Sequence, residues 1–247
     1  MNSKTYRIIN HKIPHTDPKT HFIVAILNAQ HSMLTDGKIP ETIERLQLLN
    51  NDIFLKSEFA KKSSRIIEDC YKKYARILED GQTLIKPREF FPAMREIDSL
   101  LFELSSILDF FAREINITLK LGIPLKKITF NNVVTICRKE HPEKPITKVL
   151  IEFFDSDIYR FFRGMRNRIT HRLPFLLKGK DNIIFFPDDP ESDDVIPQTE
   201  QQIDIVKTCK EWLYEILTFV DQTTILVFKK IARIKTVNIE TGEKIDL

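Results

Sequence analysis

Residues 156–173 read SDIYRFFRGMRNRITHRL, and the interpretation of the whole chain starts from this stretch. Asp155 or Ser156 is a suitable helix N-cap, and Pro174 prevents a helix from continuing. Wound as a helix, the stretch separates into two faces. The apolar face consists of Ile158, Phe161, Phe162, Met165, Ile169 and Leu173. The polar face consists of Tyr159, Arg160, Arg163, Arg166, Asn167, Thr170 and His171. The pattern predicts an amphipathic helix that packs on one side and faces solvent on the other.

The polar face of this helix is strongly basic. Seven lysines and arginines and no acidic residue lie between Arg160 and Lys180. Arginine binds phosphate through a planar fork of donors, and histidine exchanges protons near neutral pH. Asn167 and His171 are four positions apart, so they are neighbours on a helix surface. Most basic helix faces are only solvated, but the coincidence of the basic run with this amide and this histidine favours phosphate chemistry.

The string Arg166-Asn167-Arg168-Ile169-Thr170-His171 resembles the R-x(4–6)-H signature of HEPN domains, in which a polar residue often follows the arginine. The resemblance extends from about residue 88 to about residue 233. It implies an all-α helical bundle and a homodimer in which two signatures face each other. For many members it also implies metal-independent endoribonuclease activity, often in toxin–antitoxin, phage-defence or RNA-processing systems. One toxin subgroup has a tyrosine two places after the histidine, where this chain has Leu173.

The chemistry implied by this resemblance is cleavage of single-stranded or loop RNA by its own 2′-hydroxyl. It requires a proton acceptor, a proton donor and a cation at the phosphate. His171, Arg166 and Asn167 are the candidate catalytic residues, and no metal or other cofactor is expected. The residues expected to follow the RNA backbone are Arg160, Arg163, Arg168 and Arg172. The alternative is a non-catalytic HEPN-like module that binds RNA, a nucleotide or a protein partner such as an antitoxin or a regulatory protein.

Composition is that of an ordinary helical protein. The chain has 247 residues, 42% of them hydrophobic, only six glycines and a net charge of +3. Its three cysteines lie far apart without metal-ligand spacing, which favours reduced thiols in the cytoplasm. Nothing near Met1 resembles a signal peptide. The most apolar window, 212–231, contains four charged residues and is therefore expected to be a core helix and not a membrane span.

Three parts are expected: an N-terminal helical extension (1–82), a HEPN-like helical bundle (83–235) and a β-prone tail (236–247). Short β pieces are predicted at 5–9, at 183–186 and as a hairpin in the tail. Helices besides that of the motif are predicted for 17–35, for 40–80 with a break near Asn50 and Asn51, from Pro87 to before Gly122, from Thr129 as cap to Glu140, for 146–154 and for 197–234.

Other candidate sites are less specific. His11, His15, His21 and His31 fit no metal template well. An acidic residue of the helix that begins at Pro87 is a candidate to support His171, with Glu103 or Asp109 favoured. Tyr159 is placed either to stack on a base or to cover the helix edge. The acidic segment 188–194 is either an exposed loop or an RNA mimic that shields the arginines.

Overall fold

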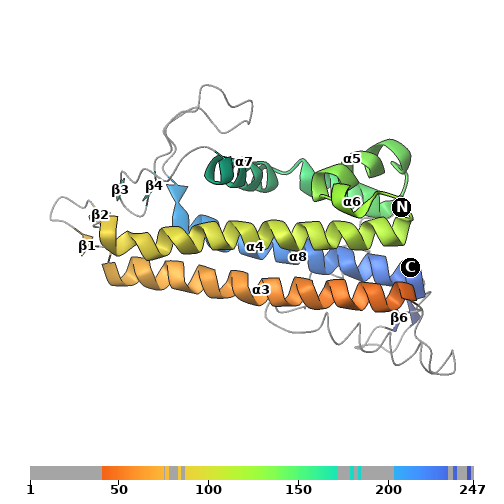
Figure 1. Ribbon diagram of the computed structural model, residues 1–247, viewed down its shortest axis with the longest axis horizontal. Helices are drawn as coiled ribbons and strands as arrows, with labels where there is room; N and C mark the ends of the chain where they lie inside the picture. The colour runs from red at the N-terminus through yellow and green to blue at the C-terminus, as the bar shows by residue number, and fades with distance from the viewer. Residues whose placement is uncertain are drawn as a thin grey trace.

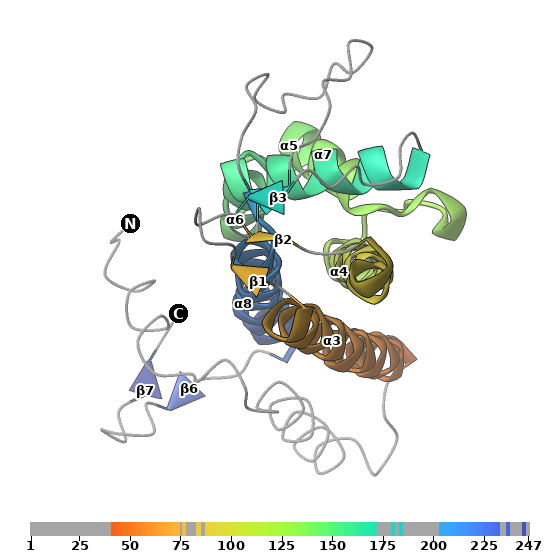
Figure 2. The same ribbon diagram turned by 90° about the vertical axis from the view of Figure 1, so that its left-hand side faces the viewer.

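The structure, a computed structural model, describes residues 41–74, 76–77, 83–84, 87–171, 179–180, 183–184, 203–232, 236–237 and 244–245. Three long helices run side by side, namely α3 (Glu41–Tyr74), α4 (Pro87–Leu119) and α8 (Ile205–Ala232) (Figure 1). Shorter helices lie across α4 and α8, on the side away from α3 (Figure 2). These are α5 (Phe130–Glu140), α6 (Pro145–Phe154) and α7 (Asp157–His171). The protein is an all-α bundle, as predicted.

The remaining elements are short. They are η1 (Leu125–Lys127), β1 (Arg76–Ile77), β2 (Thr83–Leu84), β3 (Gly179–Lys180), β4 (Ile183–Ile184), β5 (Ile203–Asp204), β6 (Thr236–Val237) and β7 (Lys244–Ile245). β1 pairs antiparallel with β2, and β4 pairs antiparallel with both β3 and β5. β6 and β7 pair antiparallel, which confirms the predicted hairpin in the tail.

α4 forms the centre of the bundle because apolar side chains recur along it every three or four positions. These side chains are buried, and they include Ile97, Leu100, Leu104, Leu108, Phe111 and Ile115. The helix ends where Lys120 and Gly122 take positive φ angles of 55° and 69°. The Asn116 side chain accepts a hydrogen bond from the Ile123 N–H at 3.1 Å and donates to its carbonyl oxygen at 3.3 Å. The predicted long helix from Pro87 is confirmed.

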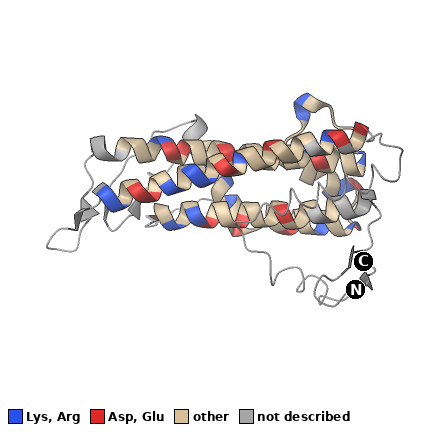
Figure 3. Ribbon diagram, turned by 90° about the horizontal axis from the view of Figure 1, so that it is seen from below, with Lys and Arg blue, Asp and Glu red and all other residues tan. Residues whose placement is uncertain are grey.

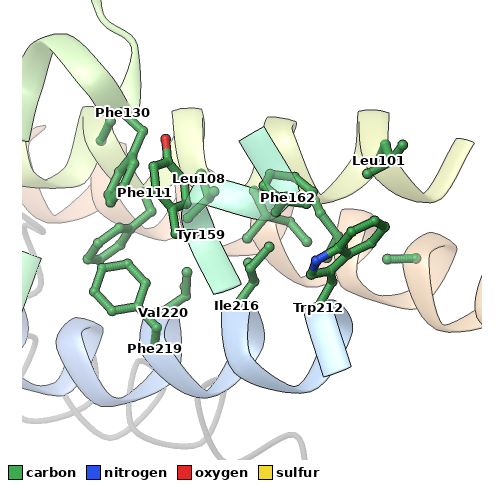
Figure 4. Close-up of a cluster of buried hydrophobic side chains, with 14 of the residues drawn as sticks. Leu101, Leu108, Phe111, Phe130, Tyr159, Phe162, Trp212, Ile216, Phe219 and Val220 are labelled. Carbon is green, nitrogen blue, oxygen red and sulfur yellow. The ribbon is translucent and has the colours of Figure 1, made fainter. Parts of the chain in front are cut away.

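An aromatic cluster joins the short helices to α8 (Figure 4). Phe153 of α6 stacks on Phe219 of α8, with ring centroids 3.8 Å apart and planes 7° from parallel. Phe130 meets Phe219 edge-on at 5.8 Å, and Tyr159 of α7 meets Phe130 edge-on at 5.4 Å. Further along α8, the buried Trp212 contacts Phe162 of α7 at 5.9 Å. These contacts fix α5, α6 and α7 against the long helices.

Local caps set where α5 and α7 begin. Thr129 accepts a hydrogen bond from the Asn132 N–H at 3.3 Å, which confirms it as the predicted N-cap of α5. The Ser156 hydroxyl accepts one from the Tyr159 N–H at 3.2 Å, so Ser156, and not Asp155, caps α7. Asp155 instead accepts two hydrogen bonds from Arg138, at 2.8 and 2.9 Å. The predicted motif helix is thereby confirmed from its start to His171.

Three of the limits and breaks predicted for the long helices are wrong. The helix predicted to run to residue 80 ends at Tyr74, because Arg76 and Ile77 pair with β2 as the strand β1. α3 continues through Asn50 and Asn51 because the Asn50 side chain is buried and finds partners, donating to the Leu46 carbonyl at 3.1 Å and to the Glu114 carboxyl at 2.5 Å. The last long helix begins at Ile205 and not at 197, because the Asp204 carboxylate accepts a hydrogen bond from the Lys207 N–H at 2.9 Å. This capping contact fixes the first turn of α8.

The predicted boundary between an N-terminal extension and the helical bundle, at residues 82 and 83, falls between α3 and α4. These two helices pack along each other, and the boundary stays a prediction. The four histidines at 11–31, the strand at 5–9, the helix at 17–35 and the acidic segment 188–194 lie outside the described residues. Basic and acidic residues are interspersed along the long helices (Figure 3). Within the described ranges, no helix is both long and apolar enough to cross a membrane.

Candidate functional site

The polar side of α7 lines a pocket of about 150 Å³ against α4 and the start of α5. α7 provides Arg163, Arg166 and Asn167, all of them half-buried. α4 provides Asp109, and α5 begins at the opposite wall. The other lining residues are Ser105, Leu108, Thr129, Phe130, Asn131, Tyr159 and Phe162. Three of the predicted site residues therefore lie together in one concave surface.

Asp109 links α4 to the start of α5. Its Oδ1 accepts a hydrogen bond from the Phe130 N–H at 3.0 Å, so the carboxylate caps a helix N-terminus from a neighbouring helix. Burial raises the pKa of the Asp109 carboxyl, while the Phe130 N–H and the guanidinium groups of Arg166 and Arg113 act to lower it. The pocket therefore contains an acidic group beside two arginines.

Of the two acidic residues favoured by the sequence, only Asp109 lines the pocket. Glu103 lies on α4 as well, but its carboxylate is 2.9 Å from the Lys56 ammonium group of α3. The two residues are six positions apart, so they emerge on different sides of the helix. Asp109 is thus the candidate acidic partner of the motif, whereas Glu103 joins α3 to α4.

Tyr159 is buried, with 5% of its surface exposed, so its predicted place on the solvent face is wrong. Its ring packs beside Phe130, and its hydroxyl points away from α8 (Figure 4). The hydroxyl donates to the Asn131 side chain at 2.6 Å. Burial raises the pKa of the Tyr159 phenol well above its ordinary range, so the phenol keeps its proton. Tyr159 forms a wall of the pocket, and the α5 contact that buries it was not foreseen.

The motif continues along α7 beyond the pocket. Arg166 donates a long hydrogen bond of 3.4 Å to the Asn167 side chain, so the two polar groups lie together. His171 is the last residue of α7 and follows Asn167 by four positions, about one helical turn. The side chains of Arg168 and His171, and the whole of Arg172, lie outside the described part of the chain. Arg160 is exposed on α7 and lies outside the pocket.

Residues 41–232 match the family described as HEPN_Cthe2314-like HEPN. The chain belongs to this HEPN family. The match begins at the first residue of α3 and ends at the last residue of α8, so it includes all three long helices and the motif helix. Comparisons with curated proteins and with solved structures found no match. A HEPN domain points to a nuclease or another RNA-related function.

The pocket of this HEPN domain is suited to bind a phosphate ester. Two guanidinium groups in a half-buried site attract an anion more strongly than they would in open solvent, because the local dielectric is lower. In the ranges that the structure describes, no group of three or more histidine, cysteine or acidic side chains is placed to hold a metal ion. The polar groups that line the pocket include the guanidinium groups of Arg163 and Arg166, the Asn167 amide and the Asp109 carboxylate.

Proposed function

We propose that this protein is a metal-independent endoribonuclease that cleaves single-stranded or loop RNA at a site formed by two copies of the chain. The observation that carries the proposal is the pocket on α7. It contains Arg163, Arg166 and Asn167 in a HEPN domain whose signature is intact from Arg166 to His171.

The reaction uses a nucleophile that RNA itself carries. The 2′-hydroxyl oxygen bonds to the adjacent phosphorus and gives its proton to one imidazole. The bond from phosphorus to the 5′-oxygen breaks, and a protonated imidazole gives that oxygen its proton. The products are a 2′,3′-cyclic phosphate and a 5′-hydroxyl end. Each proton is therefore accounted for without a metal-bound water.

The two proton transfers explain why we propose a dimer. Each chain contributes one His171 to its signature, and two-fold symmetry brings identical patches together. One His171 acts as the base, and His171 of a second copy acts as the acid. Arg166 holds the non-bridging phosphate oxygens through its planar fork, and Asn167 orients the phosphate or the imidazole. The other arginines of the basic run, one set from each copy, then extend away from the cleavage point along the RNA.

Binding of RNA outside the cleavage point is assigned to the other arginines of the basic run. Arg160 is exposed on α7, and Arg163 lines the pocket before Arg166. Spacing along one helix lets them follow successive phosphates of a single strand. This affinity is electrostatic, so it falls as salt rises. We further propose a cytoplasmic role in defence or in a toxin–antitoxin pair, with a regulatory protein that masks the same arginines.

The test is incubation of a labelled single-stranded RNA with the purified protein in excess EDTA. We expect cleavage by the wild type, and a loss of at least about 100-fold in rate for His171→Ala and for Arg166→Ala. Arg45→Ala is the matched control, because Arg45 is an exposed arginine on α3. Binding of RNA without cleavage by the wild type would support the non-catalytic module instead. Full activity of His171→Ala would overturn the mechanism.

A further inference from the structure

The pocket on α7 carries charges of both signs. The carboxylate of Asp109 lies in the same pocket as Arg163 and Arg166, and the charge on Arg166 is close enough to act on the Asp109 pKa. A bare phosphate placed there is attracted by the arginines and repelled by the carboxylate. A ligand that presents N–H donors next to an anionic group satisfies both. A nucleotide within an RNA strand has this combination, because its base carries donors and its backbone carries phosphate.

Asp109 retains hydrogen-bonding capacity toward the pocket. An ionised carboxylate has about four lone-pair sites. The Phe130 N–H, at 3.0 Å from Oδ1, uses one of them. The carboxylate is therefore held in place by the start of α5 and still has room for further donors. A pair of parallel N–H groups is the arrangement that a carboxylate binds best.

The walls of the pocket are suited to a flat apolar ring. Leu108 and Phe162 contribute apolar surface, and the Tyr159 ring is held by its hydrogen bond to Asn131. A closed cavity of about 150 Å³ takes up one benzene molecule. The volume of about 150 Å³ here is therefore sufficient for the edge of a base, but not for a whole nucleotide. Single-stranded RNA is read in this way, by an unstacked base against apolar or aromatic side chains with hydrogen bonds to its edge.

We propose that this pocket binds a guanine of the RNA strand, with both oxygens of Asp109 accepting from the N1–H and the 2-amino group of the base. Guanine is the one common RNA base whose Watson–Crick edge presents two adjacent N–H donors. Uracil presents one N–H between two carbonyl oxygens, which a carboxylate repels. Arg166 binds the phosphate that adjoins this guanine, and Arg163 follows the strand beyond that phosphate. The proposal rests on the proposed function for the position of that phosphate, since His171 follows Asn167 by one helical turn.

Direct binding tests the pocket without requiring cleavage. Two labelled RNA oligonucleotides with 2′-O-methyl groups throughout are compared by fluorescence anisotropy. They differ at one position, which is guanine in one and inosine, which lacks the 2-amino group, in the other. We expect the wild type to bind the guanine strand at least about 5-fold more tightly, as for one bidentate contact to a base. In Asp109→Asn the preference is expected to disappear, because the amide has only one acceptor oxygen.

The asparagine in Asp109→Asn can still accept from the Phe130 N–H, so the start of α5 keeps its cap. Asp157→Asn is the matched control, because Asp157 is an exposed aspartate in the first turn of α7 and it should leave the preference unchanged. Equal binding of the two strands by the wild type would overturn the proposal, and so would binding to neither. A uniform change in affinity for both strands in Asp109→Asn, with the preference intact, would show that Asp109 acts only through the arginines and would also overturn it.

The same variants separate this inference from the nuclease. Cleavage that shows no guanine preference would reject the base pocket and leave the endoribonuclease in place. A guanine preference in binding, without any cleavage in EDTA, would reject the endoribonuclease and leave a guanine-binding module.

Discussion

Replacement of Glu114 by glutamine is expected to give a variant whose advantage in free energy of unfolding over the wild type grows as pH rises. Glu114 lies on α4 and is 0% exposed. Its carboxyl accepts a hydrogen bond from the Asn50 side chain at 2.5 Å, and Thr224 of α8 is its other polar neighbour. The carboxyl thus lies where the three long helices meet, and a charge there would be poorly solvated. Burial raises the pKa of Glu114 well above its ordinary value of 4.5, and the hydrogen bond from Asn50 acts against that rise.

The sign and size of the effect follow from proton linkage. Below pH 4.5 the carboxyl is protonated in both the folded and the unfolded chain, so it adds no pH dependence. Above that pH the unfolded chain releases the proton and the folded chain keeps it. The free energy of unfolding of the wild type therefore falls by about 1.4 kcal/mol per pH unit relative to Glu114→Gln. The difference stops growing at the folded pKa of Glu114.

Urea unfolding of both proteins at pH 5, 6, 7 and 8 measures this difference. Glutamine keeps the acceptor for Asn50 and replaces the protonated oxygen with a neutral donor, so the packing is preserved. Glu152→Gln is the control, because Glu152 is exposed on α6. Its unfolding free energy should differ from that of the wild type by a constant amount. A difference between Glu114→Gln and the wild type that does not change with pH would refute the reasoning.

Two further predictions concern α7. Tyr159→Phe removes the phenol that donates to Asn131 at 2.6 Å and should lower the free energy of unfolding by about 1 kcal/mol, seen as a lower urea midpoint. An unchanged midpoint would mean that this buried hydrogen bond does not contribute to the free energy of unfolding. Arg160→Gln removes an exposed charge of the basic run and should reduce the slope of log K against log salt for single-stranded RNA by about 0.7, equally for all sequences. Arg45→Gln, on α3, should leave that slope unchanged, and an equal change in both variants would place RNA binding elsewhere.

Helices with regular apolar spacing and recognisable caps were predictable from the sequence. α4 follows from its buried leucines and isoleucines, and α5 follows from Thr129 as its cap. The continuity of α3 was not predictable, because two adjacent asparagines usually weaken a helix. Asn50 is accommodated by Glu114, 64 positions away in the sequence. Local propensity contains no information about such a partner.

The candidate site was predictable in part. The spacing of the motif indicated that Arg163, Arg166 and Asn167 share one side of α7, and all three line the pocket. The opposite walls depend on how α4 and α5 pack against that helix. Asp109 was only one of several acidic residues on α4, and the Tyr159 contact with Asn131 joins residues 28 positions apart. The periodicity of α7 alone placed Tyr159 in solvent, because it does not show that α5 covers this edge of the helix.

The most direct test of the endoribonuclease is the dependence of cleavage on a single 2′-hydroxyl. A DNA oligonucleotide with one guanosine ribonucleotide is incubated with the wild-type protein in EDTA, and the masses of the products are measured by mass spectrometry. The mechanism predicts one cut, on the 3′ side of the ribonucleotide, with a 2′,3′-cyclic phosphate on one fragment and a 5′-hydroxyl on the other. No cut should occur when the 2′-hydroxyl is methylated. Cleavage of the methylated strand, or a product that ends in a 5′-phosphate, would contradict the mechanism.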